Sequence, residues 1–216
     1  MRNSTTTMTK RLFAYAGQDI LQHQFTCDAT CLSLPLKIRL SRGPVTAIAL
    51  SLHRLTELIH EPTPIRQEMT MALLVQQRTD GAFGIDGPPD PLPTAAAIAA
   101  LGRVVNQIST INSIEDVTYN RCQAAYERGL ASLAAMQGED GLFGTADDCT
   151  DAERSLVSAF ILYLLAGDPA FRMTIRFAEL MNWFDERADQ LDPMIIALWT
   201  LAGLDRRNSA PTIQAA

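Results

Sequence analysis

The chain has 216 residues, of which 47% are hydrophobic and 19% are charged, and its formal net charge is −6. This length and composition predict one domain with a buried core and exclude general disorder. An acidic chain with a pI near 5.0 gives no electrostatic basis for binding DNA or RNA. No apolar run approaches the roughly 20 residues of a membrane helix. The N-terminus lacks the apolar core of a secretory signal, so we expect a cytoplasmic protein.

Helix start signals divide the chain into segments with helical apolar spacing. Thr63 and Asp168 each precede a proline, which is the pattern of an N-cap followed by proline at the first helical position. Thr150 and Glu153 have the spacing of a capping box. The segments that we expect to be helical are 8–23, 44–59, 64–77, 94–107, 114–137, 151–166, 169–187 and 193–205.

These segments predict an all-α fold of about eight helices. The exception is CLSLPLKIRL (31–40), which alternates like a short β-hairpin. We expect an N-terminal helix and irregular segment in 1–43, a helical repeat domain in 44–206 and a flexible tail in 207–216. Helices that are apolar nearly all round alternate with more charged ones along the chain. Because the former must be buried, the pattern predicts two layers of helical hairpins in a toroid or partial toroid.

A short motif occurs twice, with its two copies sixty residues apart. Each copy follows a helix that ends in glutamine, and together they consist of Gln77, Asp80, Gly81, Phe83 and Gly84, and of Gln137, Asp140, Gly141, Phe143 and Gly144. Gly81 and Gly141 permit a left-handed turn, and the phenylalanines fill the gap between hairpins. The glutamine and aspartate side chains are suited to bonding loop backbone. We interpret the motif as architectural rather than catalytic.

With the acidic loop and the apolar helix that follow it, this motif resembles the repeat of the terpenoid cyclase and protein prenyltransferase superfamily. The resemblance implies an α/α toroid whose inner helices begin near a central apolar cavity. A complete toroid of that kind needs more helices than this chain has room for. The resemblance therefore implies an open arc or a shortened barrel.

The densest candidate for chemistry is the acidic segment before residue 154. Asp147, Asp148 and Asp151 fit D-D-x-x-D, which in isoprenoid enzymes binds Mg²⁺ and diphosphate. Asp147 with Cys149 also matches the Asp-x-Cys part of a prenyltransferase zinc site. Neither set is complete, because no second magnesium motif follows and all three histidines precede the cluster. The alternative interpretation is that Thr150 and Glu153 cap a helix beside a solvated acidic loop.

Three further residues are candidates for ligand binding. Asp86 and Asp90 lie in a loop stiffened by four prolines, which is either a recognition surface or a rigid connection. Trp199 either packs the last hairpin or lines a cavity for an apolar ligand. His53 and His60 share a helical face, and we interpret both as ordinary half-buried histidines.

Clear repeats combined with incomplete catalytic motifs favour a binding module over an enzyme. We expect it to hold a protein partner or a small apolar ligand on its concave inner-helix face, without a cofactor. The alternative is a small isoprenoid cyclase or transferase that uses Asp147, Asp148 and Asp151 with Mg²⁺ or Zn²⁺. A third interpretation places the missing helices on another chain or copy in an oligomer.

Overall fold

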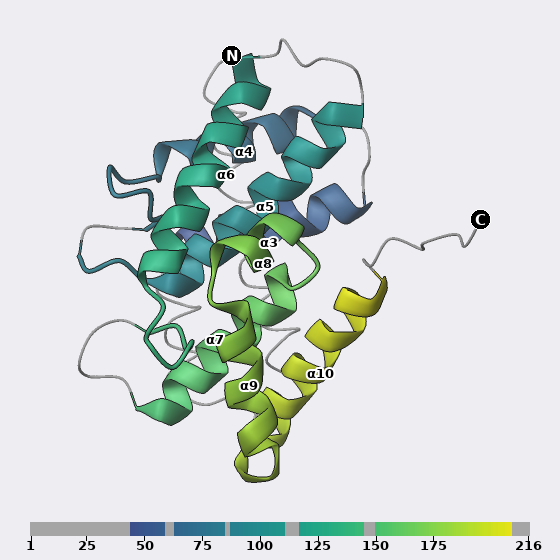
Figure 1. Cartoon of the computed structure of the whole chain (residues 1–216). Helices are drawn as coiled ribbons and strands as arrows, with labels where there is room; N and C mark the ends of the chain where they lie inside the picture. Colours follow the sequence, from purple (N-terminus) through teal and green to yellow (C-terminus); the bar gives the residue numbers. More distant parts are fainter. Residues whose placement is uncertain (1–43, 59–62, 85–86, 111–116, 145–149, 209–216) are drawn as a thin grey trace.

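The structure, a computed structural model, describes residues 44–58, 63–84, 87–110, 117–144 and 150–208 (Figure 1). These residues form eight α-helices and one 3₁₀ helix, which confirms the all-α fold. The α-helices are α3 (Pro44–Leu58), α4 (Pro64–Val75), α5 (Pro91–Thr110), α6 (Val117–Ala135), α7 (Asp151–Leu165), α8 (Pro169–Thr174), α9 (Phe177–Arg187) and α10 (Pro193–Asn208). The helix expected at 8–23, the hairpin expected at 31–40 and the end of the tail lie outside the described residues.

Side-chain caps set several of the helix starts that the sequence predicts. The Thr63 hydroxyl accepts the N–H of Arg66 at 3.4 Å. Asp168 Oδ1 accepts the N–H groups of Ala170 and Phe171 at the start of α8. Because the first N–H groups of a helix have no partner within it, these bonds stabilise each start.

Several helix boundaries differ from the prediction by two or three residues, and two differences have a clear local cause. α5 begins earlier than residue 94, at Pro91, because Asp90 Oδ1 accepts the N–H of Leu92 and caps the helix there. The helix expected at 169–187 is broken into α8 and α9. The break lies at Ile175, whose backbone is extended (φ −97°, ψ 169°) and whose side chain is buried.

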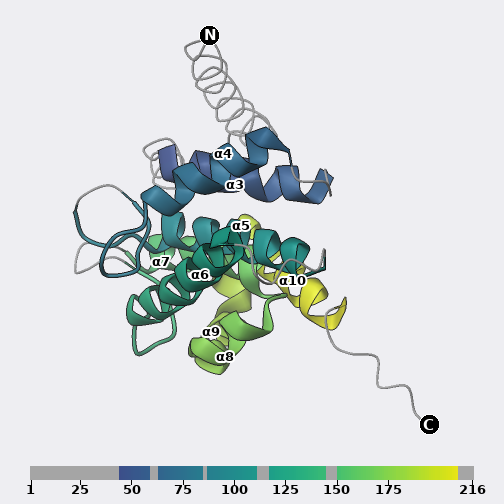
Figure 2. The ribbon, with the colours of Figure 1, turned by 90° about the horizontal axis from the view of Figure 1, so that it is seen from above.

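The helices form two rows. In the inner row α5 packs against α3 and α7, and α7 packs against α10; in the outer row α6 adjoins α4 and α8. Seen from above, α3 and α4 lie on one side of α5 and α6, and α8 and α9 lie on the other side (Figure 2). The alternation of apolar and charged helices along the chain has produced this arrangement. Closure of the rows into a toroid stays a prediction.

The core is centred on α5, whose first half is rich in alanine. Ala95, Ala96, Ala97 and Ala100 are fully buried together with Leu101. Small side chains let neighbouring helices approach closely, so this helix can be covered on several sides at once. None of the helices in the described part of the chain combines the length and hydropathy that a membrane span needs.

The two motif copies fold into the same turn. Gly81 and Gly141 have left-handed backbones with φ of 84° and 83°, as the motif predicts. In each copy the aspartate accepts the N–H two residues later at 3.1 Å. The phenylalanine N–H of each copy donates to a hydroxyl of the next inner helix, which is Thr94 in one case and Ser158 in the other.

Each turn rests on the outer helix that comes next in the chain. A Cβ atom at Gly81 would lie 2.5 Å from the carbonyl oxygen of Arg128 on α6, and one at Gly141 would lie 2.6 Å from the backbone nitrogen of Leu180 on α9. Glycine is therefore required at both positions for its backbone angle and for the close approach. The turns bind successive hairpins together.

The two glutamines differ in one bond. Gln77 donates to the carbonyl oxygens of Gly81 and Ala125, and Gln137 donates to those of Gly141 and Arg176. The side-chain oxygen of Gln137 accepts the backbone N–H of Arg176 at 2.7 Å. In the first copy α6 continues unbroken past the contact, and the oxygen of Gln77 accepts instead from the guanidinium of Arg128 at 2.6 Å. The break between α8 and α9 thus lies beside Arg176, whose backbone N–H and carbonyl oxygen are both bonded by Gln137.

Candidate functional site

A hollow of about 340 Å³ lies between the outer helices α4 and α6. Its lining residues are Leu74, Gln77, Val117, Asn120, Arg121, Ala124, Ala125 and Arg128. We call this hollow the α4/α6 groove. Ala125 is almost fully buried and belongs to the floor, whereas Val117 is 71% exposed and belongs to the rim.

Exposed apolar side chains are concentrated around the α4/α6 groove. Val75 on α4 is 73% exposed, and Met71, which contacts Arg121, has about two fifths of its surface exposed. With Val117, they are three of the eight large apolar side chains that are strongly exposed in the described residues. Exposed apolar side chains grouped in this way usually mark a contact region.

Two arginines stand in the α4/α6 groove without a carboxylate partner. Arg121 donates to the sulfur of Met71 at 3.9 Å, and Arg128 donates to Gln77. Neither forms an ion pair with any residue that the structure describes, and no acidic side chain is among the described residues that line the groove. Gln77 fixes the Arg128 guanidinium, so the motif turn also orients one of the charges of the groove.

The next two helices of the outer row, α6 and α8, are joined by a hydrogen bond. The hydroxyl of Tyr126 on α6 donates to Asp168 Oδ2 at the start of α8, at 2.5 Å. Burial, together with this bond and the charge of Asp168, raises the pKa of Tyr126 far above its ordinary value. Tyr126 is therefore a neutral donor that joins the two helices. Between α4 and α6 the contacts are instead those of Arg121 with the Met71 sulfur and of Arg128 with Gln77.

The acidic segment is described in part. Asp147, Asp148 and Cys149 lie outside the described residues, as does Asp86. The Thr150 hydroxyl accepts the N–H of Glu153 while the Glu153 carboxylate accepts the N–H of Thr150, so the predicted capping box is confirmed.

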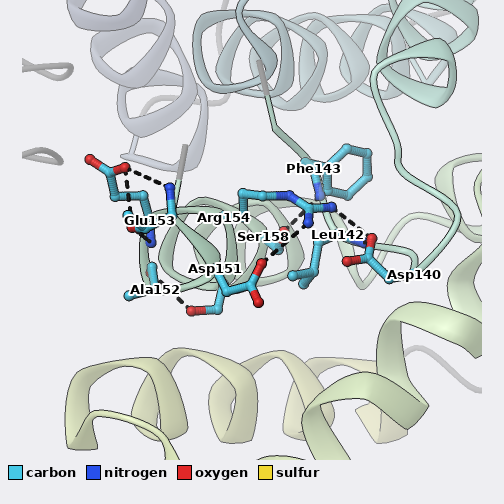
Figure 3. A network of polar contacts seen from close by, with 10 residues as sticks. Asp140, Leu142, Phe143, Asp151, Ala152, Glu153, Arg154 and Ser158 are labelled. Carbon is cyan, nitrogen blue, oxygen red and sulfur yellow. Dashed lines mark hydrogen bonds and ion pairs between the residues drawn. The ribbon is translucent and has the colours of Figure 1, made fainter. Parts of the chain in front are cut away.

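Arg154 joins this helix start to the second motif turn. Its Nη2 lies 2.7 Å from Asp140 Oδ1, and its Nη1 lies 3.5 Å from Oδ1 of the exposed Asp151 (Figure 3). Burial alone would raise the pKa of Asp140, but hydrogen bonds from Arg154 and from the N–H of Leu142 outweigh it and lower that pKa. The described carboxylates here are therefore engaged in local structure. No group of three or more metal-binding side chains occurs among the described residues.

The other two candidate residues also have structural partners. Asp90 caps α5, as given above. Trp199 stacks on Phe184 with ring centroids 6.3 Å apart and ring planes 17° from parallel. Its indole N–H is buried and has no hydrogen-bond partner in the described part of the chain. Trp199 therefore packs within the last hairpin, and a role in ligand binding stays a prediction.

A polar cluster on the inner helices was not predicted as a unit. His53 Nε2 accepts a hydrogen bond from Arg103 Nε at 2.7 Å, and Arg103 also pairs with Glu57 at 2.8 Å. Burial and the charge of Arg103 lower the pKa of His53 to about 4 despite the nearby Glu57. His53 is thus a neutral acceptor at neutral pH. The spacing of four residues between His53 and Glu57 could have indicated that they share a helix face. Nothing in the local sequence indicates that Arg103 of α5 joins them.

Comparison with protein-family models, curated proteins and solved structures finds no match to this chain. The resemblance of the two motifs to the terpenoid cyclase and prenyltransferase repeat therefore stays a prediction.

Proposed function

We propose that this chain is a protein-binding module and that the α4/α6 groove is its binding surface. One observation supports this proposal above the others. Within the described residues, a hollow, a concentration of exposed apolar side chains and two arginines without carboxylate partners coincide there. Protein interfaces combine an apolar centre with charged groups at the rim, and arginine is enriched in them.

This surface differs from the concave inner-helix face that the sequence suggested. On the inner helices, the side chains from Ala95 to Leu101 and from Ser155 to Leu162 are buried against their neighbours. Use of the inner face stays a prediction, as does the isoprenoid enzyme. The described part of the acidic segment supports helix capping, and the outer groove has more direct support as a contact surface.

A peptide selection tests the proposal. A displayed library of random peptides of about 16 residues, enough for four helical turns, is selected on the whole protein. Each enriched peptide is then measured by fluorescence anisotropy against Val75→Asp and Val117→Asp. Because both side chains are largely exposed, these changes should leave folding intact. They place a carboxylate on the groove rim at Val117 and next to the lining residue Leu74 at Val75.

The matched control is Met173→Asp on α8, where the apolar side chain is 84% exposed and is not part of the groove lining. We expect enriched peptides that lose binding to the two groove variants and keep it to the control. Failure to enrich any peptide, or equal binding to all variants, would show that the groove is not a binding surface.

A further inference from the structure

We infer that the α4/α6 groove takes an acidic amphipathic helix with two carboxylates seven residues apart. This inference rests on the proposed function and names the kind of partner. It follows from the spacing of the two groove arginines, from the absence of acidic side chains among the described residues that line the groove, and from the small residue between the arginines.

Arg121 and Arg128 are two helical turns apart on one face of α6. Seven residues of α-helix rise about 10 Å and return the side chain to nearly the same direction. A partner helix lying along α6 repeats this geometry. Carboxylates at its positions i and i+7 can therefore meet both guanidinium groups at the same time.

An extended partner does not fit this spacing. A strand rises about 3.3 Å a residue, so about three residues cover the distance between the arginines. Side chains three residues apart in a strand point to opposite faces, and those two or four residues apart miss the distance by about 3 Å. A helix satisfies both the distance and the direction.

The side chains between the arginines indicate what lies between the two carboxylates. Ala124 is the small residue at the centre of the α6 stripe, with Ala125 below it and Leu74 on the opposite wall. A large apolar side chain at position i+3 or i+4 of the partner would occupy this space. Met71 and Val75 would then cover its flank, because they stand exposed on α4. The expected peptide therefore has acidic residues at positions i and i+7 and a large apolar residue at i+3, at i+4 or at both.

A second copy of the chain is a less suitable occupant. Its α9 carries Glu179 and Glu186, also seven residues apart and exposed. At positions i+3 and i+4 between them stand the polar Asn182 and the half-buried Trp183, which packs edge-on against Phe184. That face of α9 therefore offers the charges without an accessible apolar side chain.

The experiment extends the peptide selection. Peptides that depend on the groove are sequenced, and the strongest binder is titrated by anisotropy into wild type, Arg121→Glu and the control Arg172→Glu. Arg172 is an arginine of α8 outside the groove. We expect acidic pairs at i and i+7 among the selected peptides. We also expect about a tenfold loss of affinity in Arg121→Glu and little change in the control.

A charge exchange gives the decisive readout. Replacing the facing glutamate of the peptide by lysine should weaken binding to wild type and restore binding to Arg121→Glu. Groove-dependent peptides without an acidic pair, or without this exchange, would overturn the inference and leave the proposed function standing. A lack of groove-dependent peptides would overturn both. Self-association of the purified protein that Glu179→Lys abolishes would show that the occupant is a second copy instead.

Discussion

The side chain of Gln137 holds both polar backbone atoms of Arg176. Its amide nitrogen lies 3.3 Å from the Arg176 carbonyl oxygen, and its side-chain oxygen accepts the Arg176 N–H at 2.7 Å. The same amide donates to Gly141. One side chain therefore fixes its own turn and the first residues of the next outer helix.

Replacing Gln137 by leucine should destabilise the protein by about 2 kcal/mol, because three hydrogen bonds are lost and each contributes about 0.5–1.5 kcal/mol. The measurement is the free energy of unfolding in urea. Gln123→Leu is the control, since the amide of Gln123 bonds the exposed Glu127 on the same helix. Equal stability of the two variants would contradict the importance of the link to Arg176.

Replacing Gly81 or Gly141 by alanine should lower the free energy of unfolding by about 2 kcal/mol or more. The change combines a disfavoured backbone angle with a clash against α6 or α9. Gly203→Ala is the opposite case. A Cβ at this helical glycine meets nothing within 4 Å, so alanine should stabilise α10 by about 0.5–1 kcal/mol. Thermal or urea unfolding compares the three variants, and a stable Gly141→Ala would contradict the assigned turn.

Stability should fall as the pH is lowered from about 6.5 towards about 4. His53 has an ordinary pKa of 6.5 when unfolded and a pKa of about 4 when folded, so the unfolded chain binds the extra proton across this interval. Protonation also places a positive charge beside Arg103 and Arg54, which Glu57 balances in part. We expect a loss of about 2 kcal/mol between pH 7 and pH 5.

The check on this pH dependence is a series of urea titrations of wild type and His53→Gln. The glutamine oxygen can still accept from Arg103 but does not titrate. The variant should therefore be less sensitive between pH 7 and pH 5, where Glu57 and Asp140, with lowered pKa values, remain charged. Identical pH profiles would show that His53 is not the titrating group.

The acidic segment provides a test of the isoprenoid alternative. Thr150→Ala should cost about 1 kcal/mol through the lost cap, whereas Asp151→Asn at an exposed position should change stability by less than about 0.5 kcal/mol. Calorimetric titration with Mg²⁺ and an isoprenyl diphosphate should give no binding heat. Tight binding that disappears when Asp147 and Asp148 become asparagine would favour the enzyme instead.

Helix starts were predictable because their signals are local. Thr63, Thr150 and Asp168 cap residues within three positions of themselves. The break at Ile175 was not predictable in this way, because the contact beside it comes from Gln137, on a different hairpin.

The α4/α6 groove was missed for a related reason. The sequence shows that Arg121 and Arg128 share a face of one helix, but not that the exposed side of α4 stands next to it. Periodicity identifies the faces of a helix, and only the packing of the hairpins decides which faces become neighbours.

The contact of each motif turn with a later helix also bears on how the chain folds while it is being made. Gly81 packs against Arg128, and Gly141 packs against Leu180. Each turn is therefore completed only after a later outer helix has left the ribosome. A hairpin that has just emerged has its glutamine amide and its phenylalanine still in water. The next hairpin completes it and in turn exposes its own unfinished end. Synthesis from the N-terminus thus favours ordered, stepwise growth, in which a chain that stops before α6 or before α9 ends in an incomplete motif turn.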